Sequence, residues 1–549
     1  MKIWYKRAQV LLLCMAFLGA GAAPAYAADG ERPSAITRFG YDIADAALRG
    51  LAWGVGLLMP ADIPREFQES PDFLPGMAAF LDQPAAGAKW SLGYASASLL
   101  LPGLFDPKTG DYIGPNDIFV GGGLVGNGQR LFIDRKTPTK LLDDQRVSAT
   151  ALSDGSGRGT AVFASVDGYA LTSYDVRIIR GLLREFAKAK NIVSINVGVL
   201  HQHSVIDILG MNGPLLGALF LNPLIRLLPQ GWANLYSGRN PAFMKNLQET
   251  TAQAIKDAVN GMEKGVLYYG YADATRYVHD KRAPLVLDTK LRRFRFDPDK
   301  EGVAETWLVN FAAHAVGLGA TTREISSDYP YFMWQRAQKK YGVNFQMIQG
   351  PQLAITTDYR EFGEGLDTGY ERLAAYGRGM ADLLSTIEDQ PVPPLLNVRH
   401  AEYSMPVDNP LHTLLFRSGM IQSTGYQRCL IGPDMDLVTE TAYMEIGDKL
   451  AVAFGPGEID PILAFGGAST AEEAYTGKAY EFTPMKDMVR GKRELMVFGI
   501  LNDHSGYYLV PNDIHNFVLF GNEEVNAAST QAAPALLAAF KEVTDWAKK

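Results

Sequence analysis

The sequence has only two cysteines in 549 residues. Cys14 lies in an N-terminal segment that we expect to be removed, so the mature chain would keep Cys429 alone. One cysteine can form neither an intramolecular disulfide nor a cysteine-based metal site. The mature protein must therefore be stabilised by its hydrophobic core, and any metal must be held by other side chains.

An excess of positive charge is also lacking. The chain has 52 Lys and Arg against 60 Asp and Glu, a formal net charge of -8. Proteins that bind nucleic acid usually carry a basic stripe, so no nucleic-acid partner is expected. The composition, 47% hydrophobic and 20% charged, is that of an ordinary globular protein and indicates no obligate protein partner.

The N-terminus carries an apolar run, but a short one. A basic start at Lys2 and Arg7 precedes an apolar stretch over 10–20, fewer than the roughly 20 residues that a membrane-spanning helix needs. The small residues of APAYA follow. This three-part order is typical of a secretory signal peptide. We therefore predict a signal peptide over 1–27 and a protein that is secreted or periplasmic.

After the signal peptide we predict an N-terminal extension over 28–89 and a main, catalytic domain over 90–549. The extension contains the apolar segment LAWGVGLLMP at 51–60. This segment is too short to span a bilayer. It is either a buried helix packed on the main domain or a surface that contacts a membrane or a partner.

The main domain alternates apolar strands with helices. GTAVFASVD at 159–167 predicts a buried strand, and NIVSINVGVL at 191–200 predicts another. Between them, 173–190 predicts a helix with Ser173 as its N-cap and one apolar face. That face comprises Val176, Ile179, Leu183 and Phe186. A strand-helix-strand unit favours a parallel pair of strands and the α/β class.

Reactive side chains follow the apolar strands. Histidine is scarce, with 8 residues in the chain, yet His201 and His203 both follow the run at 191–200. Three further runs end in the same way, at His314, at Glu458, and at the group Asn502, His504, Tyr507 and Tyr508. Ligands of α/β proteins usually bind beyond the carboxyl ends of the strands. The pattern therefore indicates one site built from four strand ends.

The chemistry of these residues suits a metal. Residues i and i+2 of an extended chain face the same way, so His201 and His203 can share a pocket. Neutral imidazole and carboxylate are good zinc ligands, and a phenol can join them when the metal lowers its pKa. Each element alone has an ordinary alternative: His-x-His pairs are often structural, Pro-Gly-Glu is often a turn, and His314 can be a core histidine.

Four segments resemble the neutral/alkaline (non-lysosomal) ceramidase family, zinc amidases that cleave N-acylsphingosines. LHQHS resembles its Thr-His-Thr-His-Ser element, and NFAAHAVGLGATTREISSDYP resembles its second histidine segment. IGDKLAVAFGPGE resembles its Ile-Gly-Asp…Pro-Gly-Glu element, and GILNDHSGYYLVPNDIH its Asn-x-Tyr-x-x-Tyr stretch. The segments occur in the family's order over residues 90–530.

The resemblance implies a fold and a set of roles. The fold is a large α/β mixed-sheet catalytic domain, and this chain ends before the immunoglobulin-like domain that usually follows. His203 corresponds to a histidine that binds and protonates the substrate, and Arg282 to an arginine near the active centre. The residues that match the four zinc ligands are His201, His314, Glu458 and Tyr507.

One segment departs from the family. The family has a serine in Gly-Asp-x-Ser-Pro at the zinc site, whereas alignment on Gln349 places Thr356 there. A threonine hydroxyl can contact the water at the zinc or act as a nucleophile. Its methyl group and the missing aspartate change the substrate side of the pocket.

The expected function is therefore zinc-dependent hydrolysis of the amide bond of an N-acyl lipid such as ceramide, giving a fatty acid and an amine. Two alternatives remain open. One is a hydrolase of the same scaffold that acts on a different amide or ester. The other is a non-catalytic, metal-containing lipid-binding protein of the cell envelope.

Overall fold

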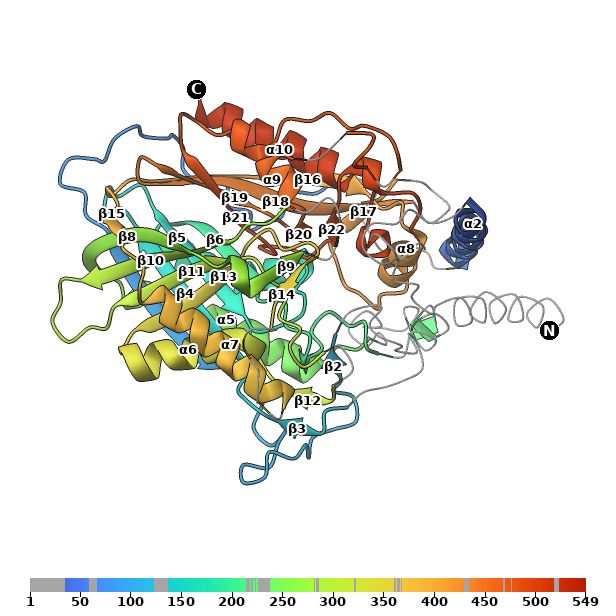
Figure 1. The fold of residues 1–549 in the computed structure, drawn as a ribbon, viewed down its shortest axis with the longest axis horizontal. Coiled ribbons are helices and arrows are strands. Elements are labelled where there is room, and N and C mark those ends of the chain that lie inside the picture. Colours follow the sequence, from blue (N-terminus) through green and yellow to red (C-terminus); the bar gives the residue numbers. More distant parts are fainter. Residues whose placement is uncertain are drawn as a thin grey trace.

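A computed structural model of the protein describes most of the chain (Figure 1). The predicted signal peptide and Cys429 lie outside the described residues. Those residues are 35–58, 67–122, 137–213, 218, 221, 222, 224, 225, 237–280, 282, 286–319, 322–359, 362, 366, 368–428, 434–467, 470–474, 476–517 and 523–549.

Two β-sheets form the centre of the molecule. The larger sheet has nine strands, eight of them in the order β13-β11-β10-β8-β1-β4-β5-β6, with β15 paired to β8. Its strands are β1 (Ser91–Ser98), β4 (Arg146–Ser153), β5 (Thr160–Val166), β6 (Ile192–Val199), β8 (Glu263–Asp273), β10 (Lys290–Pro298), β11 (Thr306–Phe311), β13 (Asn344–Gln349) and β15 (Gln390–Pro391).

The smaller sheet has five strands in the order β16-β18-β19-β21, with β17 paired to β18. Its strands are β16 (Leu396–Pro406), β17 (Gly425–Gln427), β18 (Met435–Ile446), β19 (Leu450–Phe454) and β21 (Glu494–Phe498). Short two-stranded pairs join β2 (Val120–Gly121) to β7 (Val205–Ile206), β3 (Lys140–Leu141) to β12 (Glu324–Ile325), β9 (Val278–Asp280) to β14 (Ile355–Thr357), and β20 (Glu458–Ile459) to β22 (Tyr507–Tyr508).

The two sheets pack face to face. The rings of Phe163 and Phe498, one from each sheet, lie 5.7 Å apart at their centroids. Strand β18 contributes side chains to two hydrophobic cores, because successive side chains of a strand point to opposite faces of the sheet. Ala442 and Met444 enter the core between the sheets, whereas Tyr443 packs in the core on the outer face.

Helices cover both outer faces (Figure 1). Helices α3 and α5 share a core with β4, β5 and β6, while α6 and α7 pack with β11 and β13. Helix α10 covers the smaller sheet. The helices are α2 (Ala35–Leu58), α3 (Ser173–Ala189), α5 (Pro241–Asn260), α6 (Asp328–Arg336), α7 (Gly369–Leu384), α8 (Pro410–Arg417), α9 (Pro461–Phe465) and α10 (Ala532–Ala547).

The predicted strand-helix-strand unit is present as β5-α3-β6, and its two strands are parallel. Val176, Ile179 and Leu183 are buried on the predicted face of α3, and Phe186 is partly buried. The predicted N-cap is wrong by one residue, since Thr172 occupies that position. The backbone N–H of Ser173 instead donates to the carboxylate of Asp503, 2.8 Å away.

Part of the predicted extension packs on the smaller sheet. Met77 is buried in the core between the sheets, and its N–H donates to the carbonyl of Val398 on β16. Phe80 stacks on Tyr443. The segment 51–60 falls at the end of α2, and its last residues, 59 and 60, lie outside the described part. The boundary at residue 90 stays a prediction.

Candidate metal centre

The four side chains predicted as metal ligands lie together. His201 follows β6 and His314 follows β11, while Glu458 and Tyr507 open the paired strands β20 and β22. Oxygen Oε1 of Glu458 lies 3.2 Å from Nε2 of His201, and Oε2 lies 2.8 Å from Nε2 of His314. The hydroxyl of Tyr507 lies 3.5 Å from that same Nε2 of His314. The strand-end pattern thus brings distant parts of the sequence to one point.

These separations suit a single small cation. Zinc bonds to nitrogen and oxygen of about 2.0–2.1 Å in a tetrahedron place neighbouring ligand atoms about 3.3 Å apart. The three separations above, from 2.8 to 3.5 Å, lie on either side of that value. Among the residues that the structure describes, two partly overlapping groups offer ligand atoms within 4.8 Å of one another: His201, His203 and His314, and His201, Glu458 and His504.

The orientation of the two imidazole rings also supports a cation site. Nδ1 of His201 lies 2.8 Å from the carbonyl of Tyr169, and Nδ1 of His314 lies 2.7 Å from that of Ile355. Because a carbonyl oxygen only accepts, each Nδ1 carries the proton of the neutral ring. The lone pairs of both Nε2 atoms therefore face the carboxylate of Glu458.

Burial keeps His201 in this neutral form. The side chain is fully buried, and this burial lowers the pKa of His201 to about 3. A neutral Nε2 facing a carboxylate oxygen is a contact between two acceptors, which is unfavourable unless a cation lies between them. Buried Nε2 of His201 and Oε2 of Glu458 make no hydrogen bond within the described part of the chain. The donor set fits a divalent metal.

The backbone at His201 differs from the prediction. We expected an extended chain that directs His201 and His203 to one side, but β6 ends at Val199 and His201 has a φ of 58°. This left-handed conformation costs a non-glycine residue about 1 kcal/mol. The two rings still lie together, with centroids 4.8 Å apart. The turn, rather than strand alternation, brings them to the same site.

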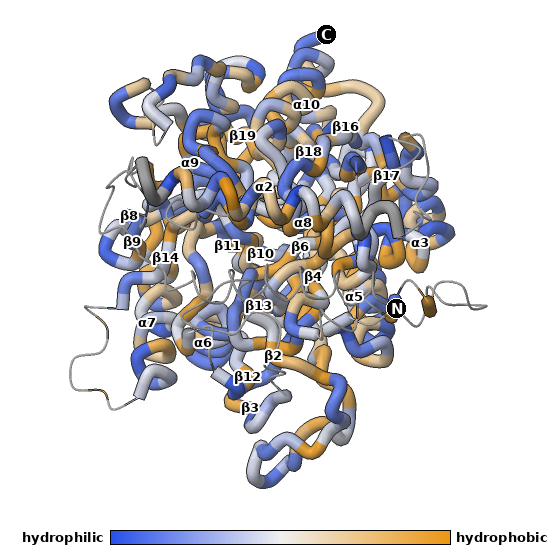
Figure 2. The backbone as a smooth tube through the Cα atoms, turned by 90° about the vertical axis from the view of Figure 1, so that its right-hand side faces the viewer, coloured by the Kyte–Doolittle hydropathy of each residue, from blue (hydrophilic) through white to orange (hydrophobic). Residues whose placement is uncertain are grey.

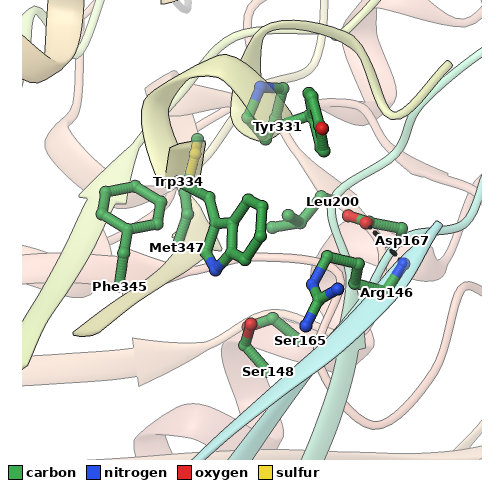
Figure 3. A pocket seen from close by; sticks show the side chains of 10 residues that line it. Arg146, Ser148, Ser165, Asp167, Leu200, Tyr331, Trp334, Phe345 and Met347 are labelled. Carbon is green, nitrogen blue, oxygen red and sulfur yellow. Dashed lines mark hydrogen bonds between the residues drawn. The ribbon is translucent and has the colours of Figure 1, made fainter. Parts of the chain in front are cut away.

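Gln202, the residue between the two histidines, is held by side-chain hydrogen bonds. Nε2 of Gln202 donates to Asp167, and Oε1 accepts the N–H of Gly168, at 2.7 and 2.8 Å. Asp167 and Leu200 line a recess that Figure 3 shows, with Arg146 stacked over Trp334 at 4.4 Å. The glutamine amide therefore anchors the turn, which the sequence reasoning did not anticipate.

His504 is the residue that sequence reasoning underrated. The sequence places it after an apolar run but predicts no role for it. Its Nε2 lies 3.2 Å from Oε1 of Glu458, and its ring stacks on His201 with centroids 5.3 Å apart. His504 is thus a further candidate ligand beside Tyr507. The only signal in the sequence was its place among the polar residues after β21.

Two neighbours hold the loop of His504 in place. Asn502 accepts the N–H of Val197 on β6 and donates to Glu440 on β18. Asp503 binds the first N–H of α3, where the helix dipole favours a carboxylate. Glu440 in turn forms a buried two-point ion pair with Arg180. Both sheets and α3 therefore position this loop.

A mainly apolar recess adjoins the cluster. It is partly open to solvent and reaches His504 and Tyr507. Its other walls come from α8 and from loops. They comprise Tyr169, Leu209, Met211, His412, Phe416, Ile421, Ser505, Gly506 and Asn526. This recess places apolar side chains next to the polar group.

Thr356 lies beside one candidate ligand. It is the central residue of β14, opposite His279 of β9, and forms an isolated parallel bridge with His314. The preceding residue, Ile355, supplies the carbonyl that orients the ring of His314. The half-buried threonine thus adjoins the backbone of the cluster.

The guanidinium of Arg282 forms ion pairs with two carboxylates. It donates to Asp460, 2.9 Å away, and to Asp513. All three side chains are buried. Asp460 is the N-cap of α9 and lies two residues after Glu458. The ion pairs of Arg282 therefore stabilise the segment that follows this candidate ligand. The direct contacts of this arginine are therefore with protein carboxylates, and its catalytic role stays a prediction.

His412 in the recess wall gives a pH-dependent prediction. Burial lowers the pKa of His412 to about 4, below the usual value near 6.5. Between these values the unfolded chain binds a proton that the folded chain does not, so stability falls as pH falls. We expect the unfolding free energy of His412→Phe, relative to wild type, to rise by about 3 kcal/mol from pH 7 to pH 4.

Urea unfolding at several pH values measures this difference. Replacement of His279 by phenylalanine is the matched control, because it removes a histidine that is exposed rather than buried. An equal pH dependence in wild type and His412→Phe would show that the buried ring is not held neutral.

Two solved structures share this fold. The structure titled neutral ceramidase from Pseudomonas aeruginosa matches with a TM-score of 0.58 and 10% identity, over 83% of this chain and 74% of that one. The structure titled ceramidase complexed with C2 matches with a TM-score of 0.57 and 12% identity, over 83% and 75%. No model of a known protein family matches the sequence, and no curated protein does. The predicted neutral-ceramidase-type α/β fold is confirmed.

Proposed function

We propose that the protein is an exported, zinc-dependent hydrolase that cleaves the amide bond of an N-acyl lipid such as ceramide. The observation that carries the proposal is the inward-facing set of buried acceptors on His201, His314 and Glu458. This set lies at the strand ends of a fold shared with ceramidases and beside an apolar recess.

The residues divide the chemistry among them. His201, His314 and Glu458, with Tyr507 or His504, would hold the ion. Bound zinc polarises a carbonyl and lowers the pKa of a water molecule to about 7. His203, whose ring centroid lies 4.8 Å from that of His201, would give a proton to the departing amine. An amide needs this proton because an amine anion is a poor leaving group.

Burial of the cluster supports the electrostatic part of the reaction. His201 and Glu458 are fully buried, and their site excludes most water. Charge that develops on a substrate oxygen is stabilised more strongly in such surroundings than in bulk solvent. The recess would take the acyl chain or the long-chain base, since both are apolar.

Thr356 provides a test of the altered substrate side. We expect Thr356→Val, which removes the hydroxyl but keeps the shape, to lower hydrolysis about 100-fold with no loss of metal. Thr356→Ser should retain activity. Thr357→Val is the matched control, because neighbouring residues of β14 face opposite ways. Steady-state kinetics and metal analysis of the three variants test this prediction. Full activity of Thr356→Val would show that the threonine hydroxyl takes no part in hydrolysis.

Two other functions are separated by one assay panel. A hydrolase of another amide or ester is favoured by Thr356 in place of the family's serine, and would cleave N-acyl amino acids or simple esters faster than ceramide. A lipid-binding protein with a structural metal would bind zinc and cleave none of them. Assaying ceramide beside these compounds is the test, and faster turnover of ceramide is the expected result.

A further inference from the structure

Three charged side chains of helix α2 are paired, and two of them reach the body of the protein. Asp42 contacts His515 at 3.1 Å and accepts a hydrogen bond from Asn516. Arg49 donates to the carbonyl of Asp408 and pairs with Asp45, which is buried. These three charged side chains are therefore all paired, although Asp42 and Arg49 stay about half exposed.

The outer side of α2 is apolar. Phe39, Ile43 and Trp53 expose 66%, 56% and 57% of their surface. At about 100° per residue these three positions lie within about 40° of one line along the helix, about 21 Å long from Phe39 to Trp53. Of the exposed residues between them, Ala46 and Gly50 lie close to this line, whereas Asp42 and Arg49 flank it at about 60° and 80° from Phe39. A surface helix in water usually has charged or polar side chains along its outermost line.

The position of α2 links this stripe to the candidate active site. Figure 2 shows α2 running across the front of the molecule over α8, and the two helices pack together. Helix α8 supplies His412 and Phe416 to the wall of the apolar recess. Arg49 also lies over the ring of Phe517, which packs in one cluster with Tyr507. The stripe and the recess therefore belong to neighbouring, directly packed elements.

We propose that α2 docks the protein on a lipid bilayer, lying in the membrane plane with Phe39, Ile43 and Trp53 inserted at the headgroup boundary. Within the described part of the chain, no helix has both the length and the hydrophobicity to cross a membrane. A helix with one apolar and one polar face binds at the interface instead. That such docking would deliver a lipid substrate to the recess rests on the proposed function.

A bilayer fits this stripe better than a second copy of the chain. At the exposures given, side chains of about 150–250 Å² offer roughly 300–400 Å² in all. A stable protein interface buries roughly 800 Å² on each partner. A narrow line of aromatic and aliphatic side chains with small residues between them matches the shallow insertion of an interfacial helix.

The test measures binding to vesicles without any turnover. Purified wild type, Ile43→Asp and Trp53→Ser are mixed with phosphatidylcholine vesicles, with and without phosphatidylglycerol, and bound protein is separated by flotation. Ile113→Asp is the matched control, because Ile113 is equally exposed, at 59%, and adjoins Asp111, which bridges to β3. All samples must share one N-terminus, verified by intact mass.

We expect wild type and Ile113→Asp to partition equally onto both kinds of vesicle, and Ile43→Asp to lose about tenfold or more. Trp53→Ser should lose several-fold. Metal content and turnover of a short-chain, water-soluble N-acyl amine should stay unchanged in all variants, which separates docking from catalysis. Absence of wild-type binding, equal loss with Ile113→Asp, binding only to anionic vesicles, or a dimer that Ile43→Asp dissociates would each overturn the proposal.

Discussion

Replacement of His201 or Glu458 by alanine will remove the bound metal and the hydrolytic activity together. Each side chain is fully buried and faces the other candidate ligands, so no solvent group can take its place easily. Removing Glu458 also removes the negative charge that offsets the cation. We expect hydrolysis to fall well beyond the 10- to 100-fold loss that outer partners of metal ligands cause.

Elemental analysis and amide hydrolysis, measured on the same preparations, test this prediction. His279→Ala is the control, because it removes an exposed histidine on β9 and should keep full metal and activity. The same measurement on Tyr507→Phe and His504→Ala shows which of the two completes the site. Full metal content in His201→Ala or Glu458→Ala would contradict the ligand assignment.

Replacement of Arg282 by methionine will destabilise the fold by about 3–5 kcal/mol, because it leaves two buried carboxylates without their cation. Asp460 and Asp513 are buried and both pair with this guanidinium. Desolvated carboxylates that lose a partner are far costlier than exposed ones. The effect is expected on stability first and on catalysis through the displaced segment after Glu458.

Urea unfolding of Arg282→Met beside Arg336→Met measures this effect. Arg336 pairs with Asp382 in a partly exposed position, so its loss should cost no more than about 1 kcal/mol. Adding Asp460→Asn and Asp513→Asn to Arg282→Met should restore most of the stability, since the two buried charges that Arg282 offset are then gone. Unchanged stability with a lost kcat would instead support the direct catalytic role predicted from the resemblance.

The sequence predicted those parts of the fold that depend on local pattern. The β5-α3-β6 unit follows from alternating and helical periodicity, and the buried face of α3 is as expected. The two packed sheets could not be predicted in this way. Strands such as β1 and β8 are antiparallel partners although about 170 residues separate them, and no local pattern encodes such pairing.

The candidate site was predicted more fully than the fold, for a physical reason. Residues at strand ends can be predicted from the sequence because an apolar run stops there and polar residues begin. This pattern, together with the resemblance, predicted the candidate ligands His201, His314, Glu458 and Tyr507. The left-handed turn at His201 and the anchoring of Gln202 by Asp167 depend on contacts between segments. The place of His504 likewise depends on how Asn502 and Asp503 bind β6 and α3.

The most direct test of the account is a zinc titration of the purified protein. A chelator removes the metal, zinc is added back in steps, and both bound zinc and ceramide hydrolysis are measured at each step. The account predicts one zinc per chain, no hydrolysis in the stripped protein, and a return of activity in proportion to bound zinc. Full hydrolysis by the metal-free protein, or full zinc occupancy with no cleavage of any amide or ester, would contradict it.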